Sequence, residues 1–297
     1  MSERDYDRVL DIAVDGDTIL VVGPDKKGLR IHSLFARTTS PVFNAMLGPS
    51  FAEGQQLAKD GRVQFALPED NSDALEIILN VIHSRTDNVP ATLTGEQLYE
   101  VAILTDKYEF HRAMGLAFHL WFQLDGIRDS SDLWLLALAA SLLGEETYFY
   151  AATSALVLHH KGSYLDLAKK HEDKGIDQGV VLQMAVLLAE KRHSVLAGAL
   201  NLGAQSIKRS LLRGDELDTA WHCGFTNYLS PDSPIPNSEY LYNIGCPVEL
   251  RARYPGYEEE MRRSTEGWEK NNGLCLWCLL DVKDHQHDDR CKTSRQK

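Results

Sequence analysis

Apolar and polar positions at the start of the chain alternate in short runs, which predicts a small unit of strands and helices. Residues 9–14 and 18–22 are rich in valine, isoleucine and leucine, and they flank an Asp-Gly turn at residues 15–17. Because Asp-Gly between two such runs is typical of a β-hairpin, we predict that these two strands pair with each other. Residues 29–31 predict a short third strand, and the alternation over residues 62–67 predicts a half-buried strand.

Helix signals are interspersed with these strands. Ser40 followed by Pro41 predicts a helix that ends near Leu47, because serine caps unpaired N–H groups and proline suits the first helical position. Thr94 and Gln97 have the spacing of a capping box, which predicts a helix through about residue 108. Apolar faces and short apolar runs predict further helices over residues 32–36, 72–83 and 111–123.

The same periodicities predict which apolar side chains form the core of this first unit. They are Leu20, Val22, Leu34, Phe43, Met46, Phe65, Leu67, Leu75, Leu79, Ile82, Leu98 and Leu104. Exposure of most of these side chains would contradict the predicted unit.

From about residue 130 the pattern predicts helices alone. Asp129 or Ser131 is placed to cap the strongly apolar segment Leu133–Leu143. Further helices are predicted over residues 146–160, 163–172, 178–192 and 194–212. Beyond Gly214 the composition is rich in loop-forming residues, and residues 247–270 include a charged helical pattern. We therefore predict an α+β domain over residues 9–123, a helical extension over 130–214 and a loop-rich C-terminal region with a Cys/His tail over 215–297.

Charge and hydropathy narrow the range of partners. The chain of 297 residues has a formal net charge of −12, whereas nucleic-acid binding usually needs a basic face. No apolar run reaches the length of about 20 residues that a membrane-spanning helix needs. The first five residues, Met-Ser-Glu-Arg-Asp, begin no secretory signal pattern. We therefore expect no nucleic-acid partner, no membrane association and a location in the cytoplasm or the nucleus.

Motifs that carry catalysis are missing from the sequence. It contains no G-x-S-x-G, no G-x-x-x-x-G-K-[ST], no G-x-G-x-x-G and no H-E-x-x-H. We therefore expect that the chain is not an enzyme.

The cysteines all lie in the last quarter of the chain, and they raise the one metal hypothesis. Cys275 and Cys278 have the C-x2-C spacing with which two thiolates hold one Zn²⁺. The remaining ligands of a structural zinc would come from Cys246, Cys291, His285, His287 or the pair His222-Cys223. In the alternative interpretation the leucines and Trp277 around the two cysteines form a hydrophobic plug, and the thiols are small buried side chains. A redox role of the two thiols is a third alternative.

The first 123 residues resemble the BTB (POZ) domain, particularly the variant abundant in filamentous fungi. Several segments carry the resemblance by their order and spacing: Gly16–Val22, Leu29–Phe35, Ser40–Leu47, Phe51–Gly54, Val63–Asp70, Ala74–His83, Leu98–Ala102 and Asp106–Tyr108. The resemblance implies a small mixed sheet flanked by helices, no catalysis and a role in protein–protein interaction. Such domains commonly form homodimers, and some attach substrates to a cullin ubiquitin-ligase scaffold.

The resemblance also assigns expectations to individual residues. Asp17, His32, Ser40 and Phe43 match structural positions of the family pattern. In the alternative interpretation Asp17 is a buried functional carboxylate, and His32 is a ligand or a base. Phe51-Ala52-Glu53 matches the hydrophobic-x-Glu element by which some BTB domains hold a cullin. A hydrophobic anchor beside one charge suits a binding hot spot. In the alternative interpretation this segment is a capping loop in which Phe51 packs into the core.

The sequence thus favours an interaction module that self-associates or recruits a protein partner. A substrate adaptor of a cullin ligase is one alternative, and a transcription-linked regulator is another. The regulator would need a DNA-binding module, and the Cys/His tail lacks the spacing of a C2H2 zinc finger.

Overall fold

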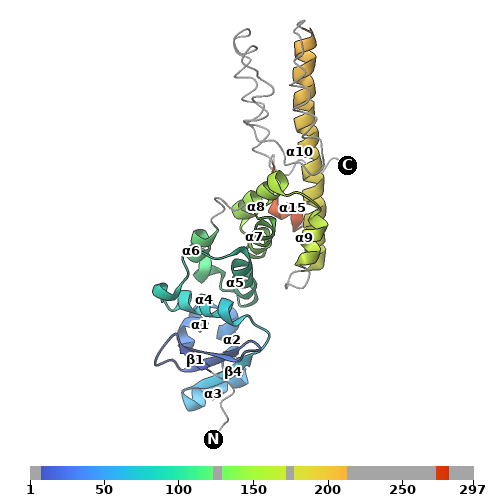
Figure 1. The fold of residues 1–297 in the computed structure, drawn as a ribbon. Helices are drawn as coiled ribbons and strands as arrows, with labels where there is room; N and C mark the ends of the chain where they lie inside the picture. Colours follow the sequence, from blue (N-terminus) through green and yellow to red (C-terminus); the bar gives the residue numbers. More distant parts are fainter. Residues whose placement is uncertain (1–7, 123–128, 172–176, 213–271, 281–297) are drawn as a thin grey trace. The chain divides into compact units, whose positions relative to one another are not determined.

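The computed structural model describes residues 8–122, 129–171, 177–212 and 272–280, and for residues 8, 198–212 and 277 it describes the backbone alone. The chain forms two compact units. Of the described residues, 8–122 and 142–144 belong to the first unit, and the others belong to the second. The class is α+β: the first unit combines strands with helices, and the described part of the second unit contains helices only (Figure 1).

A small mixed sheet organises the first unit. Its strands are β1 (Arg8–Asp11), β2 (Thr18–Val22), β3 (Lys27–Ile31) and β4 (Val63–Leu67), in the spatial order β1-β3-β2-β4. β2 runs antiparallel to β3 and parallel to β4, with Leu20 opposite both Leu29 and Phe65. Leu20 and Leu29 are fully buried, so the centre of the sheet lies in the core of this unit.

The hairpin predicted around Asp15-Gly16 is wrong. β1 pairs in parallel with β3, and the hairpin joins β2 to β3 instead. Gly16 is not among the glycines with the positive φ that a tight hairpin turn of this kind needs. It approaches β3 closely, since a Cβ on Gly16 would lie 2.4 Å from the carbonyl oxygen of Ile31. The N–H groups of Ile12 and Ala13 donate to the carbonyl of Arg30, so the chain crosses the end of β3 before β2 begins.

Six helices and one 3-10 turn accompany the sheet in the described part of the first unit. They are α1 (Ser33–Thr39), α2 (Pro41–Met46), α3 (Ala52–Asp60), α4 (Ser72–Ile82), η1 (Thr86–Asn88), α5 (Gly95–Lys107) and α6 (His111–Trp121). The local start signals are confirmed: the Ser40 hydroxyl accepts from the Phe43 N–H, and Thr94 and Gln97 form a reciprocal capping box. α3 was not expected, because its sequence AEGQQLAKD offers only a narrow apolar stripe.

Most of the predicted core is buried, with three exceptions. Leu34 is 65% exposed, because the seven-residue helix α1 buries Ser33 and Ala36 in its place. Met46 and Phe65 are half-buried. The buried members are Leu20, Val22, Phe43, Leu67, Leu75, Leu79, Ile82, Leu98 and Leu104.

The described helices of the second unit are α7 (Ser130–Leu143, whose last two residues belong to the first unit), α8 (Glu146–His159), α9 (Tyr164–Lys170), α10 (Gln178–Leu212) and α15 (Leu276–Leu279). Asp129 is the cap of α7, since its Oδ1 accepts from the N–H groups of Ser131 and Asp132. Residues 178–212 form one helix where two were expected. No helix in the described part of the chain is long and apolar enough to cross a membrane.

Candidate functional site

The Asp17 carboxylate accepts hydrogen bonds from the first residue of α1. Its Oδ1 accepts hydrogen bonds from the Ser33 N–H at 2.7 Å and from the Thr18 hydroxyl at 3.1 Å, and its Oδ2 accepts from the Ser33 hydroxyl at 2.6 Å. Partial burial acts to raise the pKa of this carboxyl, but these hydrogen bonds outweigh it and the pKa is lowered. The geometry therefore agrees with the structural role, in which Asp17 satisfies the beginning of a helix.

His32 lies beside a second histidine that the sequence did not single out. The His32 N–H donates to Nε2 of His83 at 3.2 Å, so that nitrogen carries no proton, and Nδ1 of His83 lies 2.8 Å from the carbonyl oxygen of Leu79. Burial lowers the pKa of His83. Nε2 of His32 lies 3.2 Å from a carboxylate oxygen of the exposed Asp15. His83 thus acts as a neutral hydrogen-bonding partner of the α1 start.

Ser40 and Phe43 join α2 to the end of α5. The buried Ser40 hydroxyl donates to the carbonyl oxygen of Tyr108 at 2.5 Å and accepts from the Phe43 N–H at 3.0 Å. The ring of Phe43 is fully buried, with its centroid 4.9 Å from that of Tyr108 and 5.6 Å from that of Phe110. Both residues therefore stabilise the contact between the start of α2 and the end of α5.

A buried polar cluster continues from Tyr108 and was missed by sequence reasoning. Asp70 is buried, and its carboxylate accepts from the Tyr108 hydroxyl and from Nζ of Lys107 at 2.5 Å. Burial, together with the hydrogen bond to Asp70, raises the pKa of the Tyr108 phenol strongly. The partners are nearly forty positions apart in sequence, and no local pattern predicts their contact.

Phe51 is a large aromatic side chain held at the surface. It is 49% exposed and immediately precedes α3, and Glu53 lies in the first turn of that helix. The alternative in which Phe51 packs into the core is therefore wrong. The start of α3 packs closely against the preceding loop, since a Cβ on Gly54 would lie 1.9 Å from the carbonyl oxygen of Gly48. The Phe51 N–H also donates to the Gly48 carbonyl at 3.3 Å.

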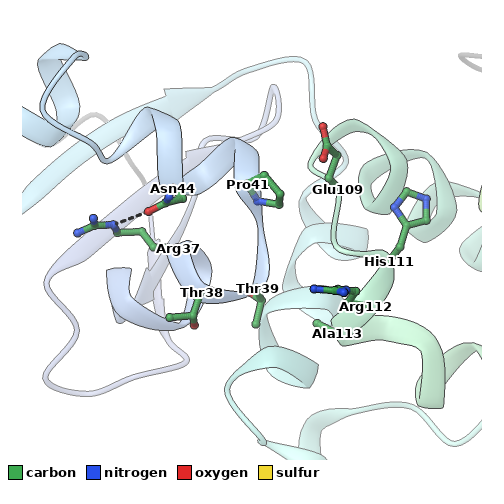
Figure 2. Close-up of a pocket in the computed structure, with 9 residues that line it drawn as sticks. All are labelled: Arg37, Thr38, Thr39, Pro41, Asn44, Glu109, His111, Arg112 and Ala113. Carbon is green, nitrogen blue, oxygen red and sulfur yellow. Dashed lines mark hydrogen bonds between the residues drawn. The ribbon is translucent and has the colours of Figure 1, made fainter.

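A cleft of about 700 Å³ lies between the α1–α2 corner and the start of α6 (Figure 2). It is adjacent in sequence to Ser40 but was not predicted. Nε of Arg37 donates to Oδ1 of Asn44 at 3.4 Å on one wall, and Arg112 extends from the start of α6 on the other. The lining residues are Arg37, Thr38, Thr39, Pro41, Asn44, Glu109, His111, Arg112 and Ala113.

The cysteine tail is described in part. Cys275 is buried and Cys278 half-buried, and α15 packs against α8 and α10. The Leu274 N–H donates to the Thr153 hydroxyl at 3.0 Å, and Leu274, Leu276 and Leu279 are buried. These leucines have the packing that the plug interpretation expects, whereas the side chain of Trp277 lies outside the described residues.

The zinc hypothesis stays a prediction. Within the described segments, no three His, Cys, Asp or Glu side chains gather as a metal site. The other proposed ligands lie outside those segments: they are Cys223, Cys246, Cys291, His222, His285 and His287. The charged helix predicted within residues 247–270 lies outside them as well.

Comparison with known proteins gives no family. No family model matches the chain, and no curated protein matches it. The function is therefore argued from the residues and surfaces described above.

Proposed function

We propose that this chain is a protein–protein interaction protein whose first unit is a BTB-type module, and that it self-associates or recruits a protein partner without catalysing a reaction. The small mixed sheet, with helices both between and after its strands, is compatible with that module. Of the residues that match the family pattern, Asp17 holds the start of α1, and Ser40 and Phe43 join the start of α2 to the end of α5. The proposed location is the cytoplasm or the nucleus.

The observation that carries the proposal is the exposure of Phe51. Removing an exposed aromatic side chain from water is favourable, so a partner that covers Phe51 gains binding free energy. The backbone of Gly54 packs directly against that of Gly48, so the position of the Phe51 ring at the start of α3 is well defined. The half-buried Glu53 supplies a charge nearby that can orient a partner.

A second copy of the chain is one candidate partner. Three exposed apolar side chains lie on α1 and the loop before β2: Val14 is 75% exposed, Leu34 65% and Phe35 41%. Leu34 and Phe35 are neighbours on α1, and exposed apolar patches are a feature of interaction sites. Sedimentation equilibrium of the full chain, with the double substitution Leu34→Ala and Phe35→Ala, tests whether self-association depends on these side chains.

Adaptor function in a cullin ligase is the second candidate, and the exposed Phe51-x-Glu53 element favours it. Isothermal titration calorimetry with a recombinant cullin N-terminal domain tests it directly. Phe51→Ala and Glu53→Ala should each weaken binding, whereas Leu116→Ala, which truncates another exposed side chain, should not. Equal binding by all four proteins, or no binding by the unsubstituted chain, contradicts the adaptor role.

A further inference from the structure

The cleft between the α1–α2 corner and the start of α6 has local charge opposite to that of the whole chain. Arg37 and Arg112 line it, against one carboxylate, that of Glu109. The complete chain carries −12. Neither arginine forms an ion pair with any residue that the structure describes, and both are exposed. Figure 2 shows the Glu109 carboxylate well apart from the Arg112 guanidinium.

Two pairs of lining side chains supply the hydrogen-bonding groups that define the ligand. The guanidinium groups of Arg37 and Arg112 only donate, and their forked geometry matches a carboxylate. The Thr38 hydroxyl donates to the carbonyl of Leu34 at 2.8 Å, and the Thr39 hydroxyl donates to that of Phe35 at 2.6 Å. Because those protons are already used, the two hydroxyl oxygens can only accept from a ligand.

We infer that this cleft binds a short acidic peptide segment of a partner protein. A peptide offers carboxylates to the arginines and backbone N–H groups to the threonine hydroxyls, whereas a bare anion offers no such donors. Pro41 and Ala113 supply apolar lining. The volume of about 700 Å³ lies in the range of sites that hold drug-sized ligands. This inference goes beyond the proposed function, since it names a second surface, separate from Phe51, and the chemistry of its ligand.

The walls of the cleft are fixed relative to each other. The Ser40 hydroxyl donates to the carbonyl of Tyr108, which ties the residue before Pro41 to the residue before Glu109. Ala113 and Met114 donate their N–H groups to the Phe110 carbonyl at 2.9 Å and 3.1 Å, which sets the first turn of α6 and with it Arg112. A preorganised site of this kind loses little conformational entropy on binding.

The test begins with a random octapeptide library displayed on phage. The full chain is immobilised, and the soluble double variant Arg37→Glu with Arg112→Glu is present in excess to remove peptides that bind elsewhere. We expect selected peptides to be enriched in Asp and Glu. Selection of peptides without acidic enrichment, or no selection at all, overturns the inference.

Synthetic versions of the selected peptides are then measured by fluorescence anisotropy. Loss of a charge-assisted hydrogen-bonded pair corresponds to about tenfold weaker binding or more, so Arg37→Glu and Arg112→Glu should each raise Kd at least that much. Arg62→Glu, which reverses an exposed charge outside the cleft, should change Kd less than about twofold. Circular dichroism verifies that each variant is folded. Equal weakening by Arg62→Glu, or unchanged binding when Gln replaces Glu in the peptide, overturns the inference without bearing on Phe51.

Discussion

The Ser40 hydroxyl donates a 2.5 Å hydrogen bond to the carbonyl oxygen of Tyr108, which lies 68 positions later in the chain. The same hydroxyl oxygen accepts from the Phe43 N–H at the start of α2. One buried side chain therefore caps a helix and ties that helix to the end of α5. Because Arg37, Asn44, Glu109 and Arg112 lie close in sequence to these two residues, the bond also sets the walls of the cleft.

Ser40→Ala should destabilise the first unit. The substitution removes the α2 cap and leaves the Tyr108 carbonyl without its hydroxyl donor, at a cost of about 1–3 kcal/mol in the free energy of unfolding. Thr39→Ala is the matched control, because the Thr39 hydroxyl bonds within its own helix, and it should cost less than about 0.5 kcal/mol. Urea denaturation measures both; equal effects would contradict the account of Ser40.

Tyr108→Phe should also lower stability, because it leaves one oxygen of the buried Asp70 without its hydroxyl donor. We expect a loss of about 1–3 kcal/mol in the free energy of unfolding. In the unsubstituted chain the pKa of Tyr108 is raised, so as the pH increases the folded state keeps the phenol proton at pH values where the unfolded state has lost it. Stability should therefore fall as the pH rises above about 10, the ordinary pKa of tyrosine. A stability curve with no steeper alkaline fall than that of Tyr108→Phe contradicts this role.

Sequence reasoning succeeded where the signal was local. Ser40-Pro41 and Thr94 with Gln97 each determine a helix start within four residues, and the structure has both. It failed where a distant partner decides the outcome. The run at residues 9–14 has the composition of a strand, but nothing local indicates that β1 pairs in parallel with β3.

The candidate functional residues also divide into those that a local pattern predicts and those that depend on distant partners. The exposed Phe51 could be identified from its pattern. The cleft could not, because it forms where α1 and α2 meet the start of α6, and these segments are far apart in the sequence. The contacts of Asp70 with Tyr108 and of His32 with His83 are likewise long-range. Leu34 was misplaced because a helix as short as α1 gives too few positions to define its buried face.

Acidification should weaken the His32–His83 contact. Burial lowers the pKa of His83, so the folded state excludes a proton that the unfolded state binds below about pH 6.5. Stability contributed by neutral His83 is present above that pH and is lost as the pH falls. His83→Gln should flatten the acid side of the stability curve relative to that of the unsubstituted chain. Burial also lowers the pKa of His160, in the second unit, and that contribution should persist in both proteins.

Gly54→Ala should displace the start of α3. The added Cβ would meet the Gly48 carbonyl oxygen at 1.9 Å, so backbone must move, and Phe51 moves with it. We expect lower stability and weaker partner binding. Gly115→Ala is the matched control: it adds a Cβ within α6 where nothing lies within 4 Å, and it should stabilise the protein by about 0.5–1 kcal/mol. Thermal unfolding of both variants measures the difference in stability. An unchanged unfolding temperature for Gly54→Ala would contradict the close packing of Gly54 against Gly48.

The most direct test of the interaction role is quantitative affinity purification of the full chain from its native cells, followed by mass spectrometry. The unsubstituted chain, Phe51→Ala and Leu116→Ala are compared at equal abundance. The account predicts at least one partner protein that is recovered with the unsubstituted chain and with Leu116→Ala but is reduced about tenfold or more with Phe51→Ala. Recovery of the same proteins in the same amounts with all three chains would contradict it.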